Sequence, residues 1–276
     1  MIKNRVKLIL RKLVLLLTKT SAGKFLYKIL LEDAMLTNKK VNHNGISLSF
    51  TAPNPLNEYR AESFSTKEPE TLDWIDSFDE GSIFWDIGAN VGLYSCYAAA
   101  KRNCQVIAFE PSVFNLELLA RNISNNSLID NISIMPLAIS DKQNLNRLNL
   151  SSTEWGGALS TFGETYGQDG KDLDIEFSFN TFGISLDMAH DIFSIKLPKY
   201  LKIDVDGIEH LILQGGPEVL KNTKEVLVEI NEGFHDQFKI SSSILTEAGF
   251  IMDRTGEYVH PDKDDSGKIC NQIWIK

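Results

Sequence analysis

The sequence predicts an α/β fold: a doubly wound, mostly parallel Rossmann-like sheet with helices on both faces, plus an N-terminal helical extension. Three observations support this prediction. Short apolar runs alternate with amphipathic helical patterns from about residue 68. A glycine turn joins one apolar run to a helical pattern at residues 84–94, and the first 30 residues are basic and rich in leucine. The 276 residues suffice for one large domain with a buried core.

Strands and helices are expected in alternation along most of the chain. The apolar runs predict strands over residues 82–86, 105–110, 132–137, 200–205 and 225–230, with an earlier strand at 45–50. The patterns between them predict helices over 91–101, 112–125, 208–220 and 241–248. Such alternation indicates βαβ units around a parallel sheet. The polar, glycine-bearing segment 151–171 is the longest expected loop, and long loops in compact domains are often functional.

The N-terminal residues differ in charge from the rest of the chain. Residues 1–30 hold eight basic and no acidic side chains; subtracting these from the 28 basic residues leaves 20 against 37 acidic, a formal charge of −17. The basic residues are Lys3, Arg5, Lys7, Arg11, Lys12, Lys19, Lys24 and Lys28. Residues 1–40 are therefore expected to form a basic amphipathic extension, and residues 41–276 the domain. Such an extension either lies on an anionic membrane or packs on the domain or a neighbouring subunit.

Composition excludes several classes of protein. No window approaches the roughly 20 uncharged apolar residues that a membrane-spanning helix needs. A net charge of −9 argues against a nucleic-acid binder. The three cysteines are scattered and lack a CxxC spacing, so neither a disulfide framework nor a zinc site is expected. We expect a cytoplasmic protein. Peripheral contact with the inner face of the membrane is one role that the extension could have.

The glycine turn predicts a nucleotide site. An apolar strand runs into Asp86, Gly88 allows a sharp turn, and Gly92 allows close packing of the helix that follows. Glu110 ends the next strand, 22 residues after Gly88, where an acidic side chain typically accepts hydrogen bonds from ribose hydroxyls. Strand, turn and helix in this order form the crevice in which doubly wound folds bind nucleotides.

The charges at this turn favour a cationic ligand over a dinucleotide. Asn90 stands where the dinucleotide fingerprint has its second glycine, and Asp86 would repel a pyrophosphate at close range. No GK[ST] sequence follows, which excludes a P-loop. S-adenosylmethionine, which carries a positive ammonium and a positive sulfonium as well as a ribose, suits the pattern better.

Several motifs together resemble the FkbM family of methyltransferases. The strongest are DIGANVGLY at 86–94, AFEPS at 108–112 and LKIDVDGIE at 201–209. Weaker blocks, LAISD at 137–141 and SLD at 185–187, occur in the expected order, as do the closing AGF and NQIW. Asp206 and Ile208 depart from the glutamate and alanine usual in the family. The resemblance implies a class I S-adenosylmethionine-dependent methyltransferase that methylates an oxygen on a polyketide, sugar or surface glycan, as in polysaccharide biosynthesis.

On this assignment the cofactor site is expected to use residues from three strand ends. Asp86 would face the methionyl ammonium, Glu110 the ribose diol, and Ser140 or Asp141 the adenine edge. The full predicted set is Asp86, Gly88, Asn90, Gly92, Glu110, Ser140 and Asp141.

A second acidic cluster predicts the reaction centre. In a strand, Lys202, Asp204 and Asp206 share one face, and the carboxyl end of that strand opens on the same crevice as Gly88. A hydroxyl becomes a good nucleophile only when it loses its proton, which a carboxylate or histidine can accept. The predicted catalytic residues are Asp204, as base, with Lys202, Glu229 and His235. Asp204, Asp206 and Glu229 offer oxygen ligands suited to a divalent cation, yet no metal-binding spacing is present and no metal is expected.

Two other functions remain open at this point. An NAD-dependent oxidoreductase or epimerase acting on a sugar nucleotide would share the fold, although Asp86 and Asn90 argue against it. A non-catalytic module that docks a partner through residues 1–40 would lack cofactor binding. The preferred interpretation is an O-methyltransferase acting on a small-molecule or glycan acceptor, without nucleic acid.

Overall fold

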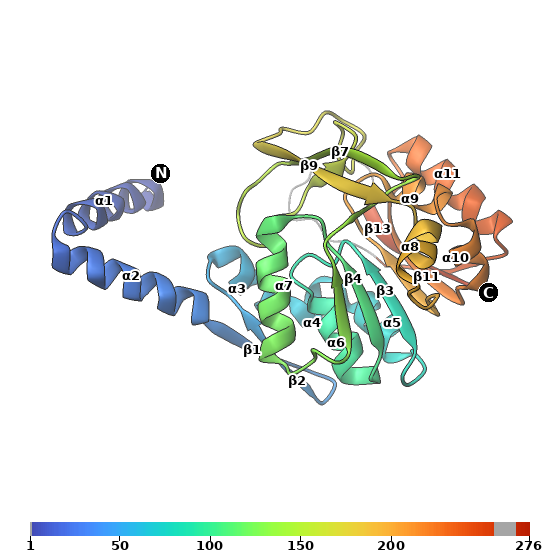
Figure 1. The fold of residues 1–276 in the computed structure, drawn as a ribbon, viewed down its shortest axis with the longest axis horizontal. Helices are drawn as coiled ribbons and strands as arrows, with labels where there is room; N and C mark the ends of the chain where they lie inside the picture. Colours follow the sequence, from blue (N-terminus) through green and yellow to red (C-terminus); the bar gives the residue numbers. More distant parts are fainter. Residues whose placement is uncertain (1, 257–268) are drawn as a thin grey trace.

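A seven-stranded sheet organises the described part of the molecule (Figure 1). The structure is a computed structural model that describes residues 2–256 and 269–276, apart from the side chains of residues 2–5 and 7. The strand order is β12-β13-β11-β10-β3-β4-β5. These strands are β3 (Ile83–Ile87), β4 (Gln105–Phe109), β5 (Ile132–Met135), β10 (Tyr200–Ile203), β11 (Glu225–Asn231), β12 (Ile251–Thr255) and β13 (Ile269–Ile275).

The sheet is mostly parallel, as the sequence predicts. Strands β5, β4, β3, β10 and β11 run parallel, whereas β13 lies antiparallel to both β11 and β12. The chain passes from β3 outward to β4 and later returns to β10 on the other side of β3. The carboxyl ends of β3 and β10 therefore form a topological switch point, where open α/β sheets bind ligands.

Alternate side chains of each strand supply two separate cores. Phe84 packs with Trp74 and Tyr97 on one face, whereas its neighbour Trp85 packs with Phe109 and Leu186 on the other. The first face is covered by α5 (Pro69–Asp76), α6 (Leu93–Arg102) and α7 (Val113–Asn125), and the second by α8 (Leu186–Phe193), α9 (Glu209–Gln214), α10 (Pro217–Asn222) and α11 (His235–Glu247). This confirms helices on both faces.

Two helical boundaries differ from the predictions. The single helix expected over 208–220 is two helices, α9 and α10, because Gly215, Gly216 and Pro217 interrupt it and Pro217 starts α10. Helix α11 begins at His235, six residues before the expected start at residue 241.

The sequence did not predict a second, four-stranded sheet of order β6-β9-β7-β8. Its strands are β6 (Ala138–Ile139), β7 (Asn144–Leu150), β8 (Ser160–Phe162) and β9 (Phe177–Ile184). The sequence of β7 alternates leucine with asparagine and arginine, and β8 lies inside the segment expected to be a loop. These strands form because β7 pairs along its whole length with β9, a long-range contact that local propensity does not reveal.

The N-terminal extension forms two helices, α1 (Ile2–Leu17) and α2 (Ser21–Leu36), which project away from the domain (Figure 1). The folded domain begins at Asn38 with β1 (Asn38–His43), which pairs with β2 (Ile46–Thr51), followed by α3 (Pro55–Glu62) and α4 (Phe64–Lys67). Within the described residues, no helix is both long and apolar enough to cross a membrane.

Candidate functional site

Two adjoining hollows lie at the switch point of the sheet. The smaller has a volume of about 530 Å³ and the larger about 1190 Å³. The residues that line both are Gly88, Asn90, Ala158, Asp204 and Asp206. The predicted cofactor turn and the predicted reaction centre therefore meet at one border.

Gly88 brings the ends of β3 and β10 together. Its φ is +83°, a conformation that side chains rarely adopt, and a Cβ there would lie 1.9 Å from the carbonyl oxygen of Asp204. Gly92 has a different role, since a Cβ on it would lie 2.3 Å from Leu119 Cδ1 in α7. Gly92 lines neither hollow and instead allows α6 and α7 to pack closely.

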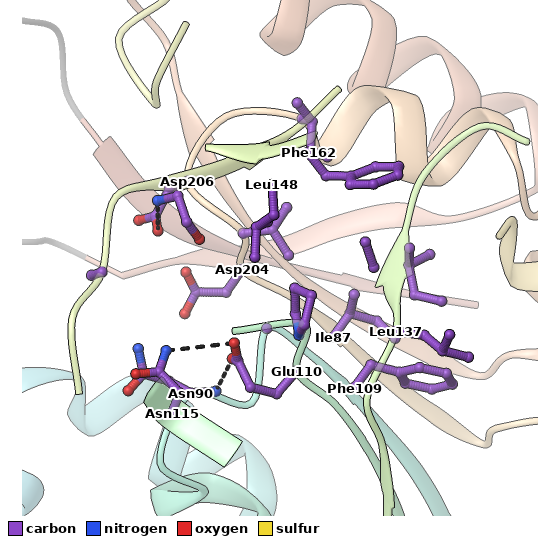
Figure 2. Close-up of a pocket in the computed structure, with 18 of the residues that line it drawn as sticks. Ile87, Asn90, Phe109, Glu110, Asn115, Leu137, Leu148, Phe162, Asp204 and Asp206 are labelled. Carbon is purple, nitrogen blue, oxygen red and sulfur yellow. Dashed lines mark hydrogen bonds between the residues drawn. The ribbon is translucent and has the colours of Figure 1, made fainter. Parts of the chain in front are cut away.

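Glu110 lies in the wall of the smaller hollow with both carboxylate oxygens held by backbone groups. Oε2 accepts a hydrogen bond from the Asn90 N–H at 2.8 Å, and Oε1 accepts one from the Ser112 N–H at 2.8 Å. Asn115 adds a longer contact of 3.5 Å from its side-chain nitrogen (Figure 2). Burial raises the pKa of Glu110 to about 7, although these hydrogen bonds oppose the rise.

The smaller hollow has a polar and an apolar side. Figure 2 shows Glu110 and Asp204 on one side and Phe109, Leu137 and Phe162 on the other. Such a pairing suits a ligand with a flat apolar ring at one end and polar groups at the other.

Ser140 and Asp141, the residues predicted at the adenine edge, line neither hollow. The segment just before them, ending at Ile139, lines the smaller hollow instead. The Ser140 N–H donates to the carbonyl of Ile184 at 2.9 Å, and Asp141 pairs with Lys142 at the surface. Residues 138–139 form β6, which pairs with β9, and the assignment of Ser140 or Asp141 to the adenine edge stays a prediction.

Asp86 is buried behind the site. Its side chain is 1% exposed, accepts a hydrogen bond from Ser95 Oγ at 2.6 Å, and lies 4.0 Å from Lys202 Nζ. Burial raises the pKa of Asp86, while Lys202 opposes the rise. Asp86 lines neither hollow, so its predicted contact with an ammonium group stays a prediction.

Lys202 links Asp86 to the border of the two hollows. It is 1% exposed, and its Nζ donates to Asp204 Oδ2 at 2.7 Å. Burial raises the pKa of Asp204, but the charge and hydrogen bond of Lys202 outweigh it and hold that pKa below its usual range. A carboxylate held ionised in this way is a good acceptor of hydrogen bonds and a weak base.

Three carboxylates converge in the larger hollow. Asp204, Asp206 and Glu229 each offer an oxygen, and these atoms lie within 4.8 Å of one another. Burial and the charge of Asp204 raise the pKa of Asp206 to about 6, and burial with both aspartates raises that of Glu229 well above its usual value. The three carboxylates offer the oxygen ligands that a divalent cation prefers, although no metal is expected from the sequence. Without a cation, the three carboxylates share protons.

The turn that carries Asp206 is fixed by Glu209. Asp206 has a φ of +64°, and its Oδ2 accepts hydrogen bonds from Leu159 N–H at 2.7 Å and Ser160 N–H at 3.3 Å. Glu209, fully buried, accepts from the N–H groups of Val205 and Gly207, and Gln237 also donates to it. The Asp206-Gly207 turn is therefore a rigid support that directs one carboxylate into the hollows.

The segment expected as a functional loop covers the border of the two hollows. Asn90 Nδ2 donates to the carbonyl of Gly157 at 2.9 Å, and Arg60 donates to that of Gly156 at 2.6 Å. Ala158 lines both hollows. Part of the segment 151–171 thus lies at the candidate site, and its function stays a prediction.

His235 does not join the other predicted catalytic residues. It is the first residue of α11, is exposed, and lines neither hollow. Conversely, Arg60 and Lys67, from α3 and α4, line the larger hollow although the sequence analysis did not single them out. No motif surrounds them, and only the fold brings these helices to the site.

The fold and the site define a class: a doubly wound α/β protein with an acidic nucleotide crevice. The model of the Methyltransferase FkbM domain matches residues 86–253, more than half of the chain. The chain belongs to the FkbM methyltransferase family and is an S-adenosylmethionine-dependent methyltransferase, which removes the oxidoreductase alternative.

Known proteins resemble this chain either in sequence or in structure. The sequence is 25% identical over 206 residues to the hexuronic acid methyltransferase AglP of Haloferax volcanii, covering 74% of this chain and 78% of that protein. Among solved structures, precorrin-6y C5,15-methyltransferase of Geobacter metallireducens aligns with a TM-score of 0.45 and 13% identity, covering 75% of this chain and 86% of the other. M. jannaschii TYW2, in complex with AdoMet, aligns with a TM-score of 0.45 and 10% identity, covering 87% and 85%.

Proposed function

We propose that the protein transfers a methyl group from S-adenosylmethionine to a hydroxyl of an acidic sugar. The observation that carries this proposal is the meeting of two hollows at Asp204 and Asp206. The smaller hollow would hold the cofactor and the larger one the acceptor, so the reacting atoms would meet beside these carboxylates.

The residues of the smaller hollow fit the cofactor. S-adenosylmethionine, when bound, supplies a methyl group on a positively charged sulfur. Glu110 has carboxylate oxygens with spare lone pairs for the ribose hydroxyls, and the apolar side, with Phe109 and Phe162, suits the adenine ring. Asp204, ionised and at the border, would place negative charge near the sulfonium.

Asp206 is the carboxylate best suited to accept the proton of the acceptor hydroxyl. Asp204 is the base predicted from the sequence, but the ion pair with Lys202 keeps the pKa of Asp204 low and makes Asp204 a weaker base than Asp206. The pKa of Asp206, about 6, leaves it ionised at neutral pH yet more basic than an ordinary aspartate. Its Oδ1 accepts no hydrogen bond from the described residues, so that oxygen is available to the hydroxyl.

One wall of the larger hollow suits a negatively charged group on the acceptor. Arg60 and Lys67 line this wall, which α3 and α4 contribute, and Lys67 also pairs with Glu68 at 3.1 Å. A carboxylate on the acceptor would be drawn to this wall, while its hydroxyl points towards Asp206. The similarity to a protein named as a hexuronic acid methyltransferase supports the same substrate class.

Labelled methyl transfer tests this function. The protein is incubated with S-adenosylmethionine carrying a labelled methyl group and with oligosaccharides that end in glucuronic acid or in glucose. We expect the acidic acceptor to be used with a kcat/KM at least tenfold higher, and the label to resist mild alkali as a methyl ether does. Label lost in alkali would show a methyl ester, and preference for the neutral sugar would refute the acidic acceptor.

A further inference from the structure

The N-terminal arm, by which we mean residues 2–36 with helices α1 and α2, is an exposed part of the molecule. Figure 1 shows it reaching away from the domain. Every described side chain of α1 is exposed. Thr20 caps α2 by accepting a hydrogen bond from the Gly23 N–H at 3.0 Å, so α2 starts as a regular helix without support from the domain.

One face of α1 is a continuous apolar stripe. Its side chains recur three or four residues apart, the spacing of one helical face, and none is less than 48% exposed. They are Val6, Ile9, Leu10, Leu13, Leu16 and Leu17. Helix α2 continues the pattern with exposed Phe25, Leu26 and Leu30. Soluble domains rarely leave such a stripe uncovered, which indicates a contact with another surface.

Charge identifies the kind of surface. The arm carries eight basic and two acidic residues, a formal charge of +6, which leaves −15 for the rest of the chain out of the total of −9. The described basic side chains of this region are all exposed: Arg11, Lys12, Lys19, Lys24 and Lys28. Two arms from two copies would repel each other, while an anionic bilayer attracts the lysines and accepts the leucines below its headgroups.

We propose that the arm docks on the surface of an anionic lipid bilayer, with α1 lying in the plane of the headgroups. The acidic domain would be held off that surface by repulsion. The arm enters the domain at β1, where Lys39 pairs with Glu58 and Glu62 of α3 at 3.5 and 3.1 Å. Helix α3 also carries Arg60, which lines the larger hollow, so the same helix contacts the junction with the arm and contributes to the hollow.

Vesicle flotation with the full chain tests this inference, whatever the methyl acceptor is. The vesicles contain phosphatidylcholine alone or mixed with anionic phosphatidylglycerol. The test variant is R11E/K12E, which reverses two charges of α1. The matched control is K142E/K239E, which reverses two exposed lysines of the domain and changes the net charge equally.

We expect the wild type and the control to float with anionic vesicles, less so at high salt, and not with neutral ones. The R11E/K12E variant should bind about 20-fold more weakly or worse, since each surface basic residue adds to the attraction. Equal flotation of the two variants, or no flotation of the wild type, would overturn the proposal. So would a lipid-free dimer of the wild type that R11E/K12E dissociates and that does not float.

Discussion

Glu110 in the smaller hollow and Asp206 at its border with the larger one are both carboxylates with raised pKa values, yet the protein holds them differently. Both oxygens of Glu110 accept backbone N–H groups, whereas only Oδ2 of Asp206 does so within the described structure. Asp206 also lies within 4.8 Å of two further carboxylates. A carboxylate fixed by donors is suited to binding, and one left with a free oxygen among like charges is suited to accepting a proton.

The largest effect is expected at Lys202, the buried lysine in the lining of the larger hollow. Lys202→Met removes the buried cation that lies between Asp86 and Asp204 while keeping a side chain of similar length. The free energy of unfolding should fall by about 3–5 kcal/mol, the usual result of breaking a buried ion pair on one side. Urea denaturation measures it, and Lys199→Met, which breaks the exposed pair with Asp79, is the control. Equal losses in the two variants would show that Lys202 is not needed to balance the carboxylates.

The next effect should appear in the rate of methyl transfer. Asp206→Asn keeps the shape, and asparagine tolerates the φ of +64°. The rate should fall about 100-fold or more because the amide cannot take the proton. Cofactor affinity should stay within about threefold, since no charge that holds the ribose has changed. Asp174→Asn, at an exposed site outside both hollows, should be active. If the folded Asp206→Asn protein transferred methyl groups at the wild-type rate, Asp204 or Glu229 would be the better candidate for the base.

Glu110→Ala should weaken the binding of the cofactor. Calorimetry should show S-adenosylmethionine bound more weakly by roughly 1.5–3 kcal/mol, because charge-assisted hydrogen bonds are lost. Glu117→Ala, on the exposed side of α7, should leave the affinity unchanged. Tight NAD binding by the wild type, with no response to S-adenosylmethionine, would refute the cofactor assignment altogether.

The rate should depend on pH through Asp206. Below the raised pKa of about 6, Asp206 is protonated and unable to act as a base, so kcat should fall about tenfold for each pH unit. Activity is thus present above pH 6 and lost as the pH falls. The Asp206→Asn variant should lack this acid limb; if the limb persists unchanged, another group produces it.

The smallest effect is expected from removing the arm. A chain that begins at Asn38 should keep its affinity for S-adenosylmethionine, because no residue of the arm lines either hollow. Calorimetry on a truncation shown by circular dichroism to be folded checks this. A clear loss of affinity would place the arm in the cofactor site.

The sequence predicted the switch-point half of the molecule better than the remainder. Strand β3, Gly88 and Glu110 follow one another within a short stretch whose turn chemistry and spacing have a direct structural meaning. The pairing of β7 with β9 and the position of Arg60 depend on contacts between distant segments, which no local pattern reveals.

Within the candidate site, the residues of the cluster were easier to predict from the sequence than the protonation states of their side chains. Lys202, Asp204 and Asp206 were recognised as one cluster because side chains of a strand alternate. The division of roles among them depends on which carboxylate Lys202 contacts, a distance that only the folded structure provides. Likewise, the sequence did not reveal that Leu137, Ala138 and Ile139, rather than Ser140 and Asp141, line the smaller hollow, since β6 leaves the main sheet to pair with β9.

We assign the smaller hollow to the cofactor and the larger one to the acceptor. Backbone hydrogen exchange, with and without the demethylated product S-adenosylhomocysteine, tests this assignment directly. We expect slower exchange at residues 88–90, 110–115 and 137–139, and no change at residues 60–68. Protection confined to residues 60–68 would contradict it, because the cofactor would then fill the hollow assigned to the sugar.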